Sequence, residues 1–174
     1  MKIAILIHEI DQIGGMGIAV FEEVRCLKDM GLDAELLVLI ENEKIQLEPF
    51  TRGIPIRYLS REFPRIFRRG VRIPPFNFFS TYHLTSAFAA VWALRDREYD
   101  VIVSHGTFNC FTAVRLAGKR KIPFIAFIWD PITYIVPRVY SSTPLKFFFF
   151  AVLPIARFFD RLFVSKSQAT VTCS

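Results

Sequence analysis

The first forty residues of the chain contain a strand pattern, then a helix pattern, then a second strand pattern. Residues 2–7, KIAILI, and residues 34–40, AELLVLI, are continuous aliphatic runs, which are typical of strands buried on both faces of a sheet. From Gly17 onward, apolar residues recur at helical spacing until Gly31 ends the helix. This strand–helix–strand order predicts two parallel strands joined by a right-handed crossover.

The same alternation continues along the chain. The further elements that it predicts are a strand at 54–59, a helix at 80–97, a strand at 99–106, a helix at 109–119, a strand at 123–129, a terminal helix that begins near 155 and ends near 167, and a strand at 169–174. A strand at 161–165 is the second choice for the terminal region. The pattern indicates one α/β domain over residues 1–174, a doubly wound parallel sheet with helices on both faces. Because such sheets bind ligands outside the carboxyl ends of their strands, the residues that follow each strand are the functional candidates.

Composition limits the classes of protein that remain. Hydrophobic residues make up 52% of the chain and 19 residues are phenylalanine, which excludes a disordered chain and predicts some apolar surface that meets a partner or a lipid. The start lacks the pattern of a secretory signal, and charges interrupt the apolar stretch 145–164, so we expect no spanning helix. Cys26, Cys110 and Cys173 lack the spacing of a metal or redox site, and we expect buried, reduced thiols in a cytoplasmic protein.

A glycine-rich turn follows the first predicted strand. Gly14, Gly15 and Gly17 stand at the start of a helix, where uncovered backbone N–H groups and the helix dipole can hold an anion such as a phosphate. A dinucleotide fingerprint would need a third glycine at position 20, where this chain has Val20. The spacing leaves two interpretations open, namely a phosphate-binding turn and a turn that only connects a strand to a helix.

Polar or aromatic residues also follow two later strands. His105 can hydrogen-bond a sugar hydroxyl or a phosphate, or exchange protons near neutral pH, and Gly106 lets another molecule approach closely. Trp129 offers an apolar face to a sugar ring, and the carboxylate of Asp130 can bind hydroxyls. Each residue by itself also fits a structural role, as a satisfied histidine at a strand end or as an Asp-Pro turn.

Residues 63–79, FPRIFRRGVRIPPFNFF, combine arginines with phenylalanines and contain no acidic side chain. Arginines attract anionic lipid headgroups at about 1 kcal/mol each, and aromatic side chains settle at the membrane interface. The residues predicted to dock on a membrane or an acceptor are Arg61, Arg65, Phe67, Arg68, Arg69, Arg72, Phe76, Phe78 and Phe79. Three alternatives stay open: aromatics that pack into the core, above all those of the terminal helix; arginines that form a solvated face; and a nucleic-acid surface, which we rank below membrane docking.

The order of these motifs resembles a known family. After the opening strand come GGMGIAVFEEVRCLKDMG, LDAELLVL, YDVIVSHGTFNCFTAVRLAGKRKIPFIAFIWDP and SQATVTCS, which together resemble the amino-terminal, Rossmann-like domain of retaining GT-B glycosyltransferases, the large family that includes mannosyl- and glucosyltransferases. The resemblance implies that the glycine turn lies beside the donor diphosphate in an interdomain cleft and that His105 contacts the transferred sugar. Trp129 and Asp130 stand where many relatives have a His-Asp pair, so the tryptophan departs from the family pattern.

The resemblance also implies partners for the chain. Relatives bind the nucleotide-sugar donor on a second domain, so we expect a C-terminal donor-binding domain or subunit as a partner and an inactive isolated chain. We expect no metal and no cofactor besides the donor substrate. The chain is then the acceptor domain of a hexosyltransferase, cytoplasmic and peripheral on the inner, anionic face of the membrane, with a lipid-linked saccharide or a lipid as acceptor. The alternative is a non-catalytic membrane-surface or nucleic-acid binding module on the same frame.

Overall fold

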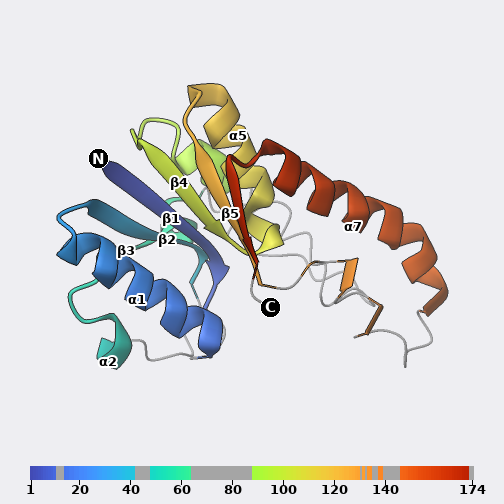
Figure 1. Cartoon of the computed structure of the whole chain (residues 1–174), viewed down its shortest axis with the longest axis horizontal. Coiled ribbons are helices and arrows are strands. Elements are labelled where there is room, and N and C mark those ends of the chain that lie inside the picture. The colour runs from blue at the N-terminus through green and yellow to red at the C-terminus, as the bar shows by residue number, and fades with distance from the viewer. Residues whose placement is uncertain are drawn as a thin grey trace.

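In the part of the chain that the structure describes, six parallel strands form one sheet (Figure 1). The computed structural model describes residues 1–10, 14–41, 48–63, 88–129, 131, 133–134, 137–138 and 146–172. The strands are β1 (Lys2–Glu9), β2 (Asp33–Ile40), β3 (Ile56–Tyr58), β4 (Val101–His105), β5 (Phe124–Ile128) and β6 (Ala169–Thr172). They lie in the order β3-β2-β1-β4-β5-β6, with every neighbouring pair parallel. The predicted Rossmann-like α/β sheet is confirmed.

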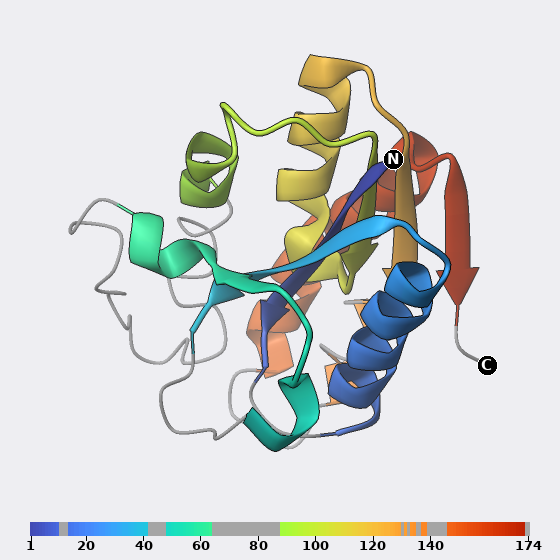
Figure 2. The same ribbon diagram turned by 90° about the vertical axis from the view of Figure 1, so that its left-hand side faces the viewer.

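Helices cover both faces of this sheet (Figure 2). The helical segments are α1 (Gly15–Asp29), α2 (Glu48–Thr51), α5 (Cys110–Arg120), α7 (Lys146–Lys166), the short turns η1 (Leu59–Glu62) and η2 (Thr107–Asn109), and residues 88–93. Because side chains alternate between the faces of a strand, Ile5 of β1 packs in the core under α1, whereas Leu6 packs in the core under α5 and α7. The two cores explain why the middle of β1, Ile3–Ile7, is apolar at every position.

The terminal helix ends where the preferred prediction placed its end, but it begins at Lys146, earlier than predicted, and its orientation also differs. α7 continues to Lys166 and β6 follows it, so the alternative strand at 161–165 is wrong. Phe163 is 0% exposed and lies in the core, whereas Phe158 is 59% exposed, so the prediction that the aromatics of this helix pack inside is only partly right. Ala156 and Phe163, which are seven residues apart, share the buried side of the helix, and Ile155 and Phe158 lie on another side.

The third strand is shorter than predicted. β3 covers Ile56–Tyr58 only, at an edge of the sheet, and the chain then tightens into η1. This turn carries Leu59 and Phe63 into the core, where each is at most 1% exposed. The first phenylalanine of the arginine–phenylalanine stretch therefore packs inside, as one of the alternatives for its aromatics proposed.

Two other predictions agree only partly with the structure. Cys26 is exposed, contrary to the expected burial, because it lies on the solvent side of α1, away from Val20 and Val24. The predicted helix at 80–97 is seen at 88–93, and its residues 80–87 lie outside the described part of the chain. Among the described residues, no helix is both long enough and apolar enough to cross a membrane.

Candidate functional site

The centre of the sheet is the point where its winding reverses. From β1 the chain proceeds to β2 on one side, whereas β4 leads to β5 on the other side. Ligands of open α/β sheets bind outside the carboxyl ends of the strands at this point. Three predicted groups follow strands there: the glycine turn before α1, His105 with Gly106 at the end of β4, and Trp129 after β5.

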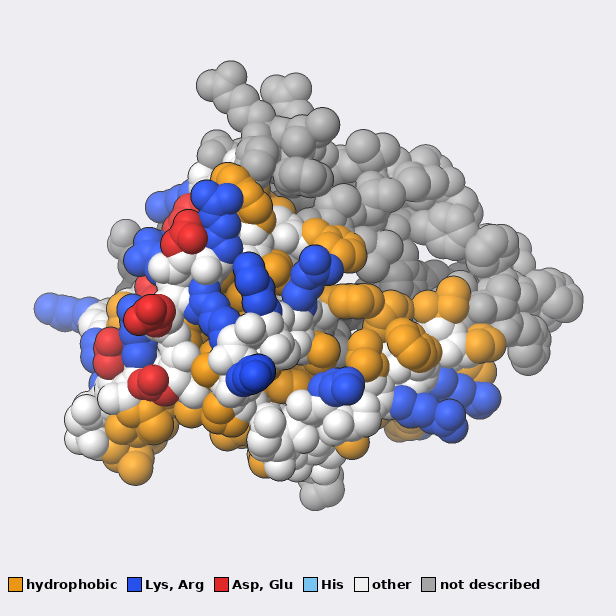
Figure 3. Space-filling model, turned by 90° about the horizontal axis from the view of Figure 1, so that it is seen from above, with side chains coloured by type: hydrophobic (Ala, Val, Ile, Leu, Met, Phe, Trp, Pro, Cys, Tyr) orange, Lys and Arg blue, Asp and Glu red, His pale blue; other side chains and the backbone are white. Residues whose placement is uncertain are grey.

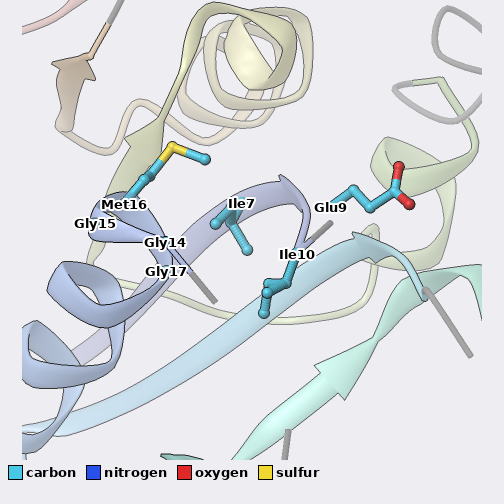
Figure 4. Close-up of a pocket in the computed structure, with 7 residues that line it drawn as sticks. All are labelled: Ile7, Glu9, Ile10, Gly14, Gly15, Met16 and Gly17. Atoms are coloured by element: carbon cyan, nitrogen blue, oxygen red, sulfur yellow. The ribbon is translucent and has the colours of Figure 1, made fainter. Parts of the chain in front are cut away.

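The glycine turn borders a small pocket (Figure 4). The pocket has a volume of about 90 Å³, and its lining comes from the end of β1 and the start of α1: Ile7, Glu9, Ile10, Gly14, Gly15, Met16 and Gly17. In Figure 4 the side chain of Glu9 extends away from the glycines. The first turn of α1 contains no acidic side chain, so none competes with a bound anion for the backbone N–H groups.

His105 lies beneath α1 and is 2% exposed. Its Nε2 is 2.6 Å from Oε2 of Glu23, a residue of α1. The indole Nε1–H of Trp129 donates to Nδ1 of His105 over 3.2 Å. The imidazole also stacks on Phe127 with ring centroids 4.6 Å apart. Both ring nitrogens of the predicted sugar-contacting histidine are therefore engaged within the domain.

The backbone around His105 is fixed by Asn109. The amide nitrogen of Asn109 donates to the carbonyl of His105 over 2.6 Å and to the carbonyl of Leu6 over 3.3 Å, which joins the ends of β4 and β1. Gly106 has φ 82°, a left-handed conformation that a side chain would strain, and its N–H donates to the carbonyl of Phe127. The glycine is thus required for the turn itself, in addition to the close approach that the sequence suggested.

Two residues of this cluster were missed by the sequence reasoning. Asn109 carries no sequence signal, because its two partners are brought to it only by the fold. Glu23, in contrast, could have been found from the sequence. It stands between Val20 and Val24, on the otherwise apolar side of α1. A charged side chain in that position needs a buried partner. That partner is His105.

Most of the predicted docking residues lie outside the described part of the chain. They are Arg65, Phe67, Arg68, Arg69, Arg72, Phe76, Phe78 and Phe79, and the candidate Asp130 also lies outside it. Arg61 is described, and its guanidinium binds the carboxylate of Glu41 and lies over the ring of Tyr58. The Arg61 hydrogen bond, opposed by some desolvation and helped by the positive charge, lowers the pKa of Glu41.

Among the residues that the structure describes, no group of three or more His, Cys, Asp or Glu side chains is placed to hold a metal ion. The sheet centre instead offers the backbone N–H groups at the start of α1, which can bind anions through hydrogen bonds, whereas the imidazole of His105 and the indole N–H of Trp129 are engaged with protein partners.

One family of proteins matches nearly the whole chain. The family described as "Glycosyl transferase 4-like domain" matches residues 14–174. The chain belongs to this family. It is thus a glycosyltransferase domain, and its sheet with the covering helices has the fold of the amino-terminal domain of GT-B enzymes.

Solved structures agree with this fold. MurG from Acinetobacter baumannii has 13% identity and a TM-score of 0.56, with 100% of this chain and 42% of that chain covered. Sucrose-phosphate synthase from Thermosynechococcus elongatus has 13% identity and a TM-score of 0.59, with 99% and 47% covered. The lipopolysaccharide outer core galactosyltransferase WaaB in its apo form has 16% identity and a TM-score of 0.51, with 74% and 33% covered. This glycosyltransferase domain spans less than half the length of each. No curated protein sequence matches it.

Proposed function

We propose that this domain is the acceptor-side half of a retaining hexosyltransferase that uses a nucleotide-sugar and no metal ion. The observation that carries the proposal is the pocket at the start of α1, at the centre of the sheet, where a helix N-terminus without acidic side chains meets the carboxyl end of β1. Backbone N–H groups in this position suit the diphosphate of a donor. His105, at the end of the neighbouring strand β4, is then the group that meets the transferred sugar.

The proposal includes a partner. A donor-binding domain or subunit would close over this pocket and supply the nucleotide site, so the isolated chain is expected to transfer no sugar. The similar structures support this part, since each is more than twice as long as the region that this chain covers in it. Asp130, which lies outside the described residues, stays a proposed ligand for sugar hydroxyls.

We further propose a lipid-linked acceptor and docking on the anionic inner surface of the membrane. The name of one similar structure, a lipopolysaccharide outer core galactosyltransferase, supports a lipid-linked acceptor. The side chains of α7 support docking: Ile155 and Phe158 are more than half exposed, next to the exposed Arg157 and Arg161. Figure 3 shows hydrophobic side chains gathered over α7 with Lys and Arg side chains beside them.

An acidic side chain on α7 does not weaken this surface. Asp160 accepts hydrogen bonds from the backbone N–H of Thr133, over 3.0 Å, and from its hydroxyl, over 2.7 Å. The carboxylate of Asp160 therefore joins Thr133, which follows β5, to α7. The apolar and basic side chains of α7 are what an anionic membrane would meet, through apolar burial and headgroup attraction.

The anion pocket can be tested with glycine-selective ¹⁵N labelling. The chain has eight glycines, so its ¹H–¹⁵N spectrum is simple enough to follow each amide while UDP, as the probe, is added. We expect the amides of Gly14, Gly15 and Gly17 to shift, and those of Gly31 and Gly118, at the other ends of helices, to stay in place. Unchanged signals at millimolar UDP, or equal shifts of all glycines, would contradict a diphosphate site in the pocket.

A further inference from the structure

The two hydrogen bonds of His105 define its protonation state. An indole N–H can only donate, so the bond from Trp129 requires a lone pair on Nδ1 of the imidazole. The carboxylate of Glu23 accepts hydrogen bonds, so its contact with Nε2 requires a proton there. Together the two contacts select the neutral imidazole with its proton on Nε2.

This neutral state is unexpected beside a carboxylate. A negative charge within hydrogen-bond distance favours the doubly protonated, charged imidazole. The second proton would have to occupy Nδ1, which is the atom that accepts the indole N–H of Trp129. A charged imidazole would leave two N–H groups pointing at each other inside the protein, where His105 is 2% exposed.

We infer that Trp129 is a positioning residue that fixes the tautomer of His105, with the ring proton on Nε2 and with Nδ1 as an acceptor. Among the contacts that the described residues make, Glu23 of α1 is the charged group at the ring. Phe127 stacks on the imidazole and Asn109 holds its carbonyl, and both are uncharged.

The inference rests on the proposed function for its meaning and deepens it. In a sugar-transfer site, a neutral His105 can exchange its Glu23 partner for an oxygen of the sugar and donate one hydrogen bond from Nε2. It cannot accept a proton at Nδ1 while Trp129 holds that nitrogen. His105 would thus orient the sugar as a hydrogen-bond donor and would not act as a general base.

The imidazole nitrogens report this state directly in ¹⁵N NMR spectra. The full chain is labelled with ¹⁵N-histidine at pH 7, and His8→Gln and His83→Gln variants identify the signals of His105 among the three histidines. We expect a protonated Nε2 and an unprotonated Nδ1 in the wild-type chain. A charged His105, or a neutral one with the proton on Nδ1, would overturn the inference without any variant.

The role of Trp129 is tested by Trp129→Phe, which removes the N–H and keeps an aromatic ring. We expect the fraction of His105 that carries a proton on Nδ1 to rise in this variant, because no donor then occupies that nitrogen. Trp92→Phe is the matched control, because Trp92 is half exposed on residues 88–93 and should leave His105 unchanged. An equal Nδ1-protonated fraction in wild type and Trp129→Phe would overturn the inference. Neither spectrum requires sugar transfer, so a failure of the proposed function is detected separately, by the UDP titration.

Discussion

The two faces of the sheet depart from the usual inside–outside distribution in opposite directions. Between the sheet and α1, the side chains of Glu23 and His105 contact each other. They lie beside an apolar core that contains Ile5, Val20 and Val24. On the other face, α7 leaves Phe158 exposed to solvent. Buried polar groups and exposed apolar ones both cost stability unless a partner or a ligand compensates. The comparison therefore assigns the two proposals to separate faces: recognition of a ligand to the face under α1, and docking to the face that carries α7.

The largest expected effect separates two phenylalanines of the same helix. Phe163→Ala should lower the free energy of unfolding by about 3–5 kcal/mol, because it opens a cavity in the core. Phe158→Ala should change it by about 0.5 kcal/mol or less, since the ring is mostly exposed. Urea denaturation of both variants measures the difference. Equal losses would mean that Phe158 is packed in solution, and the exposed surface of α7 would be rejected.

The next effect concerns docking. Removing Arg157 and Arg161 together as alanines should weaken binding to anionic vesicles about 30-fold, because each arginine contributes about 1 kcal/mol near the surface. Cosedimentation with anionic and neutral vesicles, at low and high salt, measures this loss.

The matched control for docking is Lys28→Ala/Arg52→Ala, which removes the same charge from the region of α1 and α2. A third variant, with alanine at Arg65, Arg68 and Arg69, tests the arginine–phenylalanine stretch separately. Equal weakening by the control would indicate a general charge effect, and absence of salt-sensitive binding by the wild-type chain would reject docking altogether.

A smaller effect is expected on the polar side of the comparison. Asn109→Ala removes the donor that satisfies the carbonyls of His105 and Leu6, and should lower the free energy of unfolding by about 1–2 kcal/mol. Hydrogen exchange should show faster exchange at the ends of β1 and β4 than at the start of these strands. A variant as stable as the wild type would show that water replaces the amide and that the two strand ends are not joined by Asn109.

The smallest expected effect concerns the ion pair between Glu41 and Arg61 at the surface. The pKa of Glu41 is lowered by Arg61, so the ion pair adds stability above the unfolded-state pKa, near 4.5, and this contribution disappears as the pH falls through the lower folded-state value. Arg61 is largely exposed, so screening limits the contribution to well under about 1 kcal/mol. Glu41→Gln should slightly flatten the plot of unfolding free energy against pH between about pH 5 and about pH 3, the range around the ordinary pKa of a glutamate. A steeper curve in the variant would contradict the assigned direction.

The sequence predicted the strands and helices because their periods are set by the backbone. It could not predict which side of α7 faces inward, since apolar residues occur on several sides of that helix and only packing against Phe124 selects Phe163. The candidates were taken from the carboxyl ends of the strands, and the structure places His105 and Trp129 there, but their roles stay predictions. Their contact could not be foreseen, because it depends on the register of β4 against β5, which pairs His105 with Phe127, two residues before Trp129.

The position of β1 has a consequence for folding during synthesis. β1 pairs with β2 on one edge and with β4 on the other, and β4 begins at Val101, far behind β2 in the order of synthesis. At a ribosomal rate of about 5–20 residues per second, the second edge of β1 waits for roughly 3–12 s after β2 has been made. During this interval β1, whose residues Ile3–Ile7 are all apolar, exposes an unpaired edge, so the nascent chain most needs protection from aggregation while β1 and β2 are the strands already made.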